Sequence, residues 1–245
     1  MDQALILGVV PSAVAIAAAA IAVWGQLRVK RVEAQLATQK SEADRRAETE
    51  HTARQFREPL CRAAYELQSR IFNIVRGGFL QVYMETGDDR TRSYAIHHTV
   101  FVIAQYFGWT ELIRREIQFI DLGKDEDTRR LAQLQHRIYA AFQTDRYTPL
   151  LRVFGGEQHA IDERMIREGP RGPQCIGYAG FLDYLQSDPD PLISAIESDV
   201  QALGTRLKQA LPRLVEFQHA LIDLVVFLDP QAVRFPEKNR IKIDF

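Results

Sequence analysis

The sequence predicts an all-α protein that consists of an N-terminal transmembrane helix, a helical stalk and an irregular cytoplasmic bundle of helices. Three observations support this fold class. Residues 4–24 contain no charged side chain. Apolar residues recur at intervals of three and four through most of residues 59–228, as they do on the buried face of a helix. Apart from the short sequence Ile241-Lys242-Ile243, no run alternates between apolar and polar side chains as a half-buried strand would.

These patterns divide the chain into four segments. We expect a single transmembrane anchor at residues 1–24, a charged helical stalk or linker at 25–58, a helical bundle domain at 59–230 and a short tail at 231–245. The bundle shows no internal repeat of fixed length, which favours an irregular bundle over a solenoid.

The overall composition is typical of a folded globular protein, with 46% hydrophobic and 26% charged residues among 245. It therefore excludes an intrinsically disordered chain. The formal net charge of −1 gives no support to nucleic-acid binding. Two cysteines are too few for a disulfide framework.

The predicted anchor begins at Ala4 and ends at Trp24. A helix of this length is roughly 31 Å long, which matches a hydrocarbon core of about 30 Å, and tryptophan is favoured at the membrane interface. A cleaved signal peptide is the alternative, but it needs a basic N-terminal region and a shorter apolar run. Because Met1, Asp2 and Gln3 provide no basic side chain, we expect an anchor.

The orientation of the anchor follows from three basic residues on its C-terminal side, Arg28, Lys30 and Arg31. The positive-inside rule places such a flank in the cytoplasm. We therefore expect a single-pass protein of the cell membrane, bacterial in origin, with its N-terminus outside and its C-terminal domain cytoplasmic. The lipid bilayer is then its first expected partner.

The stalk region, residues 25–58, is rich in charged and helix-forming residues. A heptad pattern begins at Val29, Val32 and Leu36 but does not continue, whereas a coiled coil needs three or four heptads. We therefore expect a solvated helix or linker, with a short parallel pairing of two chains as the alternative.

The bundle pattern is interrupted at several points. Gly77 and Gly78 are expected to end or interrupt the first helix, Gly108 is expected to break the most apolar region, and Pro212 is expected to kink the last helix or delay its start. The predicted helices cover residues 60–74, 79–84, 90–107, 109–120, 126–142, 157–168, 175–185, 192–203 and 205–228.

One sequence motif has the spacing of a metal site. Glu216 and His219 lie three residues apart on a predicted helix, as in di-iron carboxylate bundles, which use two such motifs. The other copy, Glu48 with His51, lies in the stalk. We therefore expect a solvated polar face and no bound metal.

Cys175 is the candidate nucleophile, because a predicted helix begins there and a helix N-terminus lowers a thiol pKa. His159 is the nearest histidine in sequence, and Glu157 precedes it. No known cysteine-hydrolase signature surrounds these residues, so a small buried cysteine is the preferred interpretation. The adjacent pair His97 and His98 points in different directions on a helix and does not chelate one ion.

The sequence contains none of the common phosphate-binding, dinucleotide-binding or hydrolase motifs. We therefore expect a membrane-anchored interaction or scaffold protein that presents a cytoplasmic helical domain to an unknown protein partner, and neither an enzyme nor a protein with a cofactor. One alternative is a membrane-tethered enzyme or sensor with a site between helices near Cys175. The other is a membrane effector that forms a homo-oligomer through its alanine-rich span.

Overall fold

The computed structural model describes residues 3–117, 125–170, 172–187 and 189–244. Only the backbone is described for residues 3–23, 45–55, 116–117 and 125. The chain forms two units, Met1–Thr49 and Glu50–Phe245. The features that bear on function lie in the second unit.

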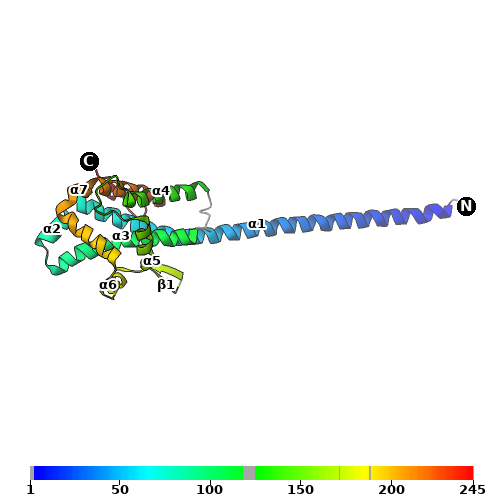
Figure 1. Cartoon of the computed structure of the whole chain (residues 1–245). Coiled ribbons are helices and arrows are strands. Elements are labelled where there is room, and N and C mark those ends of the chain that lie inside the picture. Colours follow the sequence, from blue (N-terminus) through cyan, green and yellow to red (C-terminus); the bar gives the residue numbers. More distant parts are fainter. Residues whose placement is uncertain (1–2, 118–124, 171, 188, 245) are drawn as a thin grey trace. The chain divides into compact units, whose positions relative to one another are not determined.

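The expected all-α class is confirmed, since helices dominate the described residues (Figure 1). One antiparallel hairpin is the only sheet within these ranges. The elements are α1 (Gln3–Val75), α2 (Phe79–Thr86), α3 (Asp89–Ile117), α4 (Asp125–Gln143), α5 (Gly155–Met165), β1 (Ile166–Gly169), β2 (Gly172–Cys175), α6 (Tyr178–Ser187), α7 (Pro191–Leu228) and the short 3-10 helix η1 (Glu237–Asn239).

The expected membrane topology needs a correction. Among the residues that the structure describes, no helix combines the length and the apolar character needed to cross a membrane. The predicted single-pass protein, with its N-terminus outside and its domain cytoplasmic, disagrees with this finding and is withdrawn. Among the α1 side chains that the structure describes, ionisable groups recur from Arg28, Lys30 and Arg31 onward, too often for a membrane span. The apolar run from Ala4 to Val23 lies outside the residues whose side chains are described.

The predicted stalk residues belong to α1, which continues through them as helix. The heptad residues Val29, Val32 and Leu36 are exposed, as is Trp24 at 62%. The boundary at residue 58 is a prediction that nothing in the structure tests.

In the second unit, α1 buries the face that its periodicity predicts. Its apolar side chains at intervals of three and four enter the core: Leu60, Ala64, Leu67, Ile71 and Ile74. The helix ends at Val75, and Gly78 follows with a φ of +61°, a left-handed conformation that favours glycine. The predicted end of this helix near the two glycines is therefore confirmed.

Gly108 does not break the central helix, because α3 runs without interruption from Asp89 to Ile117. Its role is to allow close packing. A Cβ atom at this position would lie 2.8 Å from the Cβ of Met165 and 2.9 Å from the Sγ of Cys175. The absent side chain thus lets α3 approach α5 and β2.

The region after α5 differs from the expectation, because a hairpin replaces the ends of two predicted helices. The strands pair Ile166 with Cys175 and Gly169 with Gly172. Gly172 has a φ of +99°, which a side chain would strain. Helix α6 begins only at Tyr178, so Cys175 lies on a strand and not at a helix N-terminus.

Helix α7 joins two predicted helices across a kink. Arg206 has a non-helical φ of −115° and ψ of 22° inside it. The kink therefore lies at the junction of the two predicted helices, and not at Pro212, six residues further on, where it was expected. At the N-terminus of this helix, the Asp190 carboxylate caps it by accepting a hydrogen bond from the backbone N–H of Leu192 at 2.8 Å.

The C-terminal tail is extended and packs on α7. The Gln218 side chain donates to the carbonyl oxygen of Ile241 at 2.7 Å and accepts from the backbone N–H of Ile243 at 3.1 Å. The Ile243 side chain is only 2% exposed. These contacts make the tail part of the folded unit.

Candidate functional site

A cavity of about 230 Å³ lies among α3, α4 and α5. Each helix contributes residues at helical spacing, so that one face of each helix is turned towards the same space. The lining residues are Tyr106, Phe107, Thr110, Glu111 and Arg114 from α3, Ala132, Gln135, His136 and Tyr139 from α4, and Gln158, His159 and Asp162 from α5.

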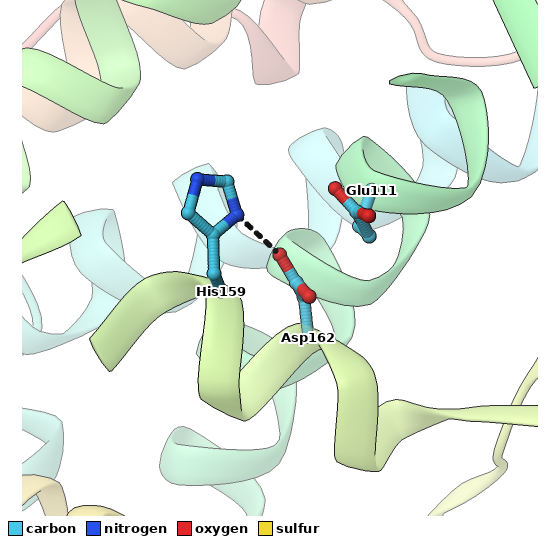
Figure 2. A group of neighbouring side chains, drawn as sticks. All are labelled: Glu111, His159 and Asp162. Atoms are coloured by element: carbon cyan, nitrogen blue, oxygen red, sulfur yellow. Dashed lines mark hydrogen bonds and ion pairs between the residues drawn. The ribbon is translucent and has the colours of Figure 1, made fainter. Parts of the chain in front are cut away.

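Three ionisable side chains that line this cavity lie close together, as Figure 2 shows. One oxygen of Glu111, one oxygen of Asp162 and one ring nitrogen of His159 all lie within 4.8 Å of one another. The side chain of Glu111 is 3% exposed and that of Asp162 is 7% exposed, whereas that of His159 is 50% exposed. Two buried carboxylates therefore lie next to a half-exposed imidazole.

Glu111 is held by two arginines of its own helix. Arg114 donates to both carboxylate oxygens, at 2.5 and 2.7 Å, and Arg115 donates to Oε1 at 2.7 Å. Burial raises the pKa of Glu111, but the arginine hydrogen bonds outweigh this effect and hold the pKa below its ordinary value. Glu111 is therefore ionised at neutral pH.

Asp162 has the opposite environment. Burial, reinforced by the negative charge of Glu111, raises the pKa of Asp162 from 3.8 to about 8. Its Oδ2 atom lies 3.3 Å from Nδ1 of His159. Its Oδ1 atom is buried and has no hydrogen-bond partner in the part of the chain that the structure describes. A proton or a bound ligand would therefore stabilise the buried Asp162 carboxyl group more than that of Glu111.

Other polar atoms on the cavity wall also lack partners. Nε2 of Gln135 and the hydroxyl oxygens of Tyr106 and Thr110 are buried and form no hydrogen bond of ordinary geometry with any described residue. Burial raises the pKa of Tyr106, against a smaller opposing effect of the neighbouring Thr110 hydroxyl. A buried polar group without a partner costs about 1–3 kcal/mol, so such groups point to bound water or ligand.

The sequence-based candidates are only partly brought together here. His159 lines the cavity, but Cys175 and Glu157 do not. Cys175 lies on β2, with its Sγ 3.9 Å from the carbonyl oxygen of Gln105, and burial raises its pKa to about 12. The Glu157 carboxylate instead accepts a hydrogen bond from the backbone N–H of Phe154 at 2.8 Å and caps α5. The helix N-terminus expected at Cys175, on which its candidacy as a nucleophile depended, is therefore wrong.

The Glu216 and His219 motif is used in packing contacts. Arg146 donates to Glu216 at 3.1 Å, and Nε2 of His219 lies 2.9 Å from the carbonyl oxygen of Ile243. Asp223, one turn further, accepts from Lys242 at 2.6 Å.

The histidine pair of α3 also divides between different neighbours. His97 lies 3.5 Å from the carboxylate of Glu197. His98 instead lies 2.8 Å from a guanidinium nitrogen of Arg70.

The sequence patterns did not predict that Glu111 and Asp162 lie together beside His159. A signal existed for each. Glu111 directly precedes Leu112 and Ile113, two core residues, on an apolar region of α3. Asp162 follows His159 at the spacing of one helical turn, which places both on the same face.

Comparison of the chain with protein-family profiles, with curated protein sequences and with solved structures found no match in any of the three.

Proposed function

We propose that residues 50–245 form a binding module that holds a small polar ligand in the cavity among α3, α4 and α5. The observation that supports this most is that several residues lining one cavity carry buried polar atoms without partners among the described residues. Asp162 and Gln135 lie on different helices, both line the same cavity, and each has a buried polar atom without a partner among the described residues. Ligand sites in proteins commonly combine an apolar wall with a few such polar groups.

The residues around the cavity indicate what the ligand must offer. Gln135 provides a donor, Asp162 an acceptor or a donor according to its protonation, and Thr110 a hydroxyl that does either. Phe107 and Tyr139 supply aromatic surface. These groups suit a compact molecule with an apolar or aromatic body and at least one amide, hydroxyl or carboxyl group.

This proposal is nearest to the sensor alternative of the sequence analysis, with the site moved from Cys175 to the other face of α3. The scaffold role, an unknown protein partner and homo-oligomer formation stay predictions.

The test compares a blocked cavity with an open one. Ala132 is an exposed alanine that lines the cavity, so Ala132→Phe adds a ring to the cavity at a position outside the core. Gln133→Phe introduces the same ring at the next exposed position of α4, outside the cavity, and serves as the control. Binding of small amides, phenols and polyols is measured by saturation-transfer NMR in the presence of EDTA.

We expect compounds that bind the unchanged protein to bind Gln133→Phe equally and to lose their signal with Ala132→Phe. Equal binding to both variants would show that the compounds occupy another surface and would contradict the proposal. Absence of binding to the unchanged protein across all three compound classes would contradict it as well.

A further inference from the structure

We propose that a divalent transition-metal ion, for which Zn²⁺ is the representative, binds between Glu111, His159 and Asp162 at the carboxylate end of the cavity. This inference deepens the proposed function and rests on it in one respect, because the ion and the small ligand share the cavity. The site joins one residue of α3 to two residues of α5 (Figure 2).

The geometry is close to that of a bound ion. Zinc bonds to nitrogen and oxygen are about 2.0–2.2 Å long, so two ligand atoms of a tetrahedral ion lie roughly 3.4 Å apart. Nδ1 of His159 and Oδ2 of Asp162 are already 3.3 Å apart. The widest separation in the group is within 4.8 Å. Closing this separation to the spacing around a bound ion takes a shift on the order of 1 Å.

Asp162 provides an independent observation. It is 93% buried, because its side chain is only 7% exposed, and its Oδ1 atom forms no hydrogen bond to any residue within the described ranges. A buried carboxylate oxygen without a donor is costly, and an ion held by both oxygens of Asp162 would satisfy Oδ1 as well as Oδ2.

The arginines beside Glu111 determine which ions fit. Arg114 and Arg115 fix the orientation of the Glu111 carboxylate, and such second-shell contacts are usual for metal-ligating carboxylates. The two positive charges of these arginines offset the two negative charges that Glu111 and Asp162 carry when both are ionised. Ca²⁺ and Mg²⁺ depend on oxygen ligands of high negative charge, so a nearly neutral site disfavours them. The imidazole of His159 instead favours zinc and the neighbouring transition metals.

The three residues leave a coordination position open. A zinc ion with three protein ligands takes a water or a small ligand as its fourth. Since all three residues line the cavity, this fourth position belongs to the cavity. A ligand with a carboxylate, hydroxyl or imidazole group would then bind to the ion directly.

The experiment is isothermal titration calorimetry of the full chain with zinc chloride after removal of metals by EDTA and desalting. Asp162→Asn and His159→Gln each remove one ligand. His136→Gln is the matched control, because His136 lines the same cavity and is an exposed histidine, but it lies outside the group of three. Since His159 is half exposed, its substitution leaves the fold intact.

We expect one equivalent of Zn²⁺ to bind, with affinity reduced by at least about tenfold in Asp162→Asn and in His159→Gln, and unchanged in His136→Gln. Ca²⁺ should bind more weakly than Zn²⁺. The ring nitrogen signals of His159 should shift on addition of Zn²⁺ in ¹⁵N NMR spectra.

Absence of stoichiometric zinc binding would overturn the inference, and so would equal affinity in all three variants. These failures can be told apart from failure of the proposed function, because the compound-binding test is made in EDTA. Compound binding without zinc binding would refute only the metal site. Zinc binding without compound binding would refute only the small-ligand function.

Discussion

The guanidinium group of Arg213 in α7 donates a hydrogen bond from Nη1 to the carbonyl oxygen of Ala141 in α4, at 2.7 Å. The same group also reaches the carbonyl oxygens of Phe142, Thr144 and Thr148. Arg213 is fully buried, and burial lowers its pKa. It therefore satisfies the last carbonyls of α4, which a helix end leaves without partners, and ties the wall of the cavity to α7.

Replacing this arginine should destabilise the domain strongly. Arg213→Met keeps the apolar stem but removes a donor from four carbonyl oxygens, of which that of Phe142 retains a hydrogen bond from the backbone N–H of Val153. We therefore expect the free energy of unfolding to fall by about 3–5 kcal/mol. Urea denaturation followed by circular dichroism measures the change. Arg146→Met, which removes an exposed ion pair with Glu216, is the control and should cost less than about 1 kcal/mol. Equal losses for the two variants would contradict the role assigned to Arg213.

Gly108 and Gly180 should respond to alanine in opposite directions. At Gly108 the new Cβ would lie within 2.9 Å of Met165 and Cys175, so Gly108→Ala should lower the free energy of unfolding by about 1–3 kcal/mol. At Gly180, in α6, the nearest neighbour of a Cβ is Ile176 at 3.7 Å. Gly180→Ala should therefore raise stability by about 0.5–1 kcal/mol, as expected inside a helix. Thermal and urea denaturation of both variants would show whether the signs differ.

The stability of the metal-free protein should depend on Asp162 with a defined sign. Its pKa is 3.8 in the unfolded chain and about 8 in the folded one. The folded state therefore binds more protons between these values, and the free energy of unfolding falls as the pH rises from about 4 to 8. The side chain in Asp162→Asn cannot ionise. In EDTA at pH 8, the free energy of unfolding of this variant should therefore exceed that of the unchanged protein by about 1 kcal/mol or more.

Near pH 4 the two proteins should have equal stability. Urea denaturation at both pH values gives the comparison, and Asp183→Asn, at an exposed position of α6, is the control. A stability difference that is the same at pH 4 and pH 8 would refute the raised pKa of Asp162.

His98 should cause a loss of stability in mild acid. Its Nδ1 atom faces a guanidinium nitrogen of Arg70 at 2.8 Å, and the rings of Tyr94 and Tyr178 cover it. Burial, and next the charge of Arg70, lower the pKa of His98 from 6.5 to about 4. The unfolded chain thus takes up the proton first, so the free energy of unfolding falls as the pH decreases from 6.5 towards 4.

The substitution His98→Gln keeps an acceptor for Arg70 and removes the titration. We expect a shallower decrease of the urea midpoint between pH 7 and pH 5 in this variant than in the unchanged protein. His136→Gln, at an exposed position of α4, should leave the decrease unchanged. A decrease of the same size in His98→Gln would assign the acid sensitivity to other groups.

The fold could be predicted from the sequence wherever local periodicity decides the structure, as for α1 from Leu60 to Ile74. The fold could not be predicted at positions where one residue type can serve two different structural roles. Gly108 was expected to break a helix, but the same missing side chain serves close packing, and only the partner helix distinguishes the two. The hairpin from Ile166 to Cys175 was missed because its strands are four residues long and contain proline and glycine.

The candidate site shows the same limit. His159 and Asp162 are one helical turn apart, so local sequence places them together. Glu111 lies on a different helix, and only tertiary packing of α3 against α5 brings it to them. The attention given to Cys175 followed from an expected helix start that the structure replaces with a strand.

The way in which Gln218 holds the tail has a consequence for hydrogen exchange. Its amide bonds to the backbone on both sides of residue 242, as a neighbouring strand would, and Gln218 itself is fully buried. The amide proton of Ile243 is therefore protected from solvent, although it lies in an extended segment outside any helix or sheet. Its exchange should require opening of the interface with α7, so this single amide reports the cooperative unfolding of the bundle and not local fraying.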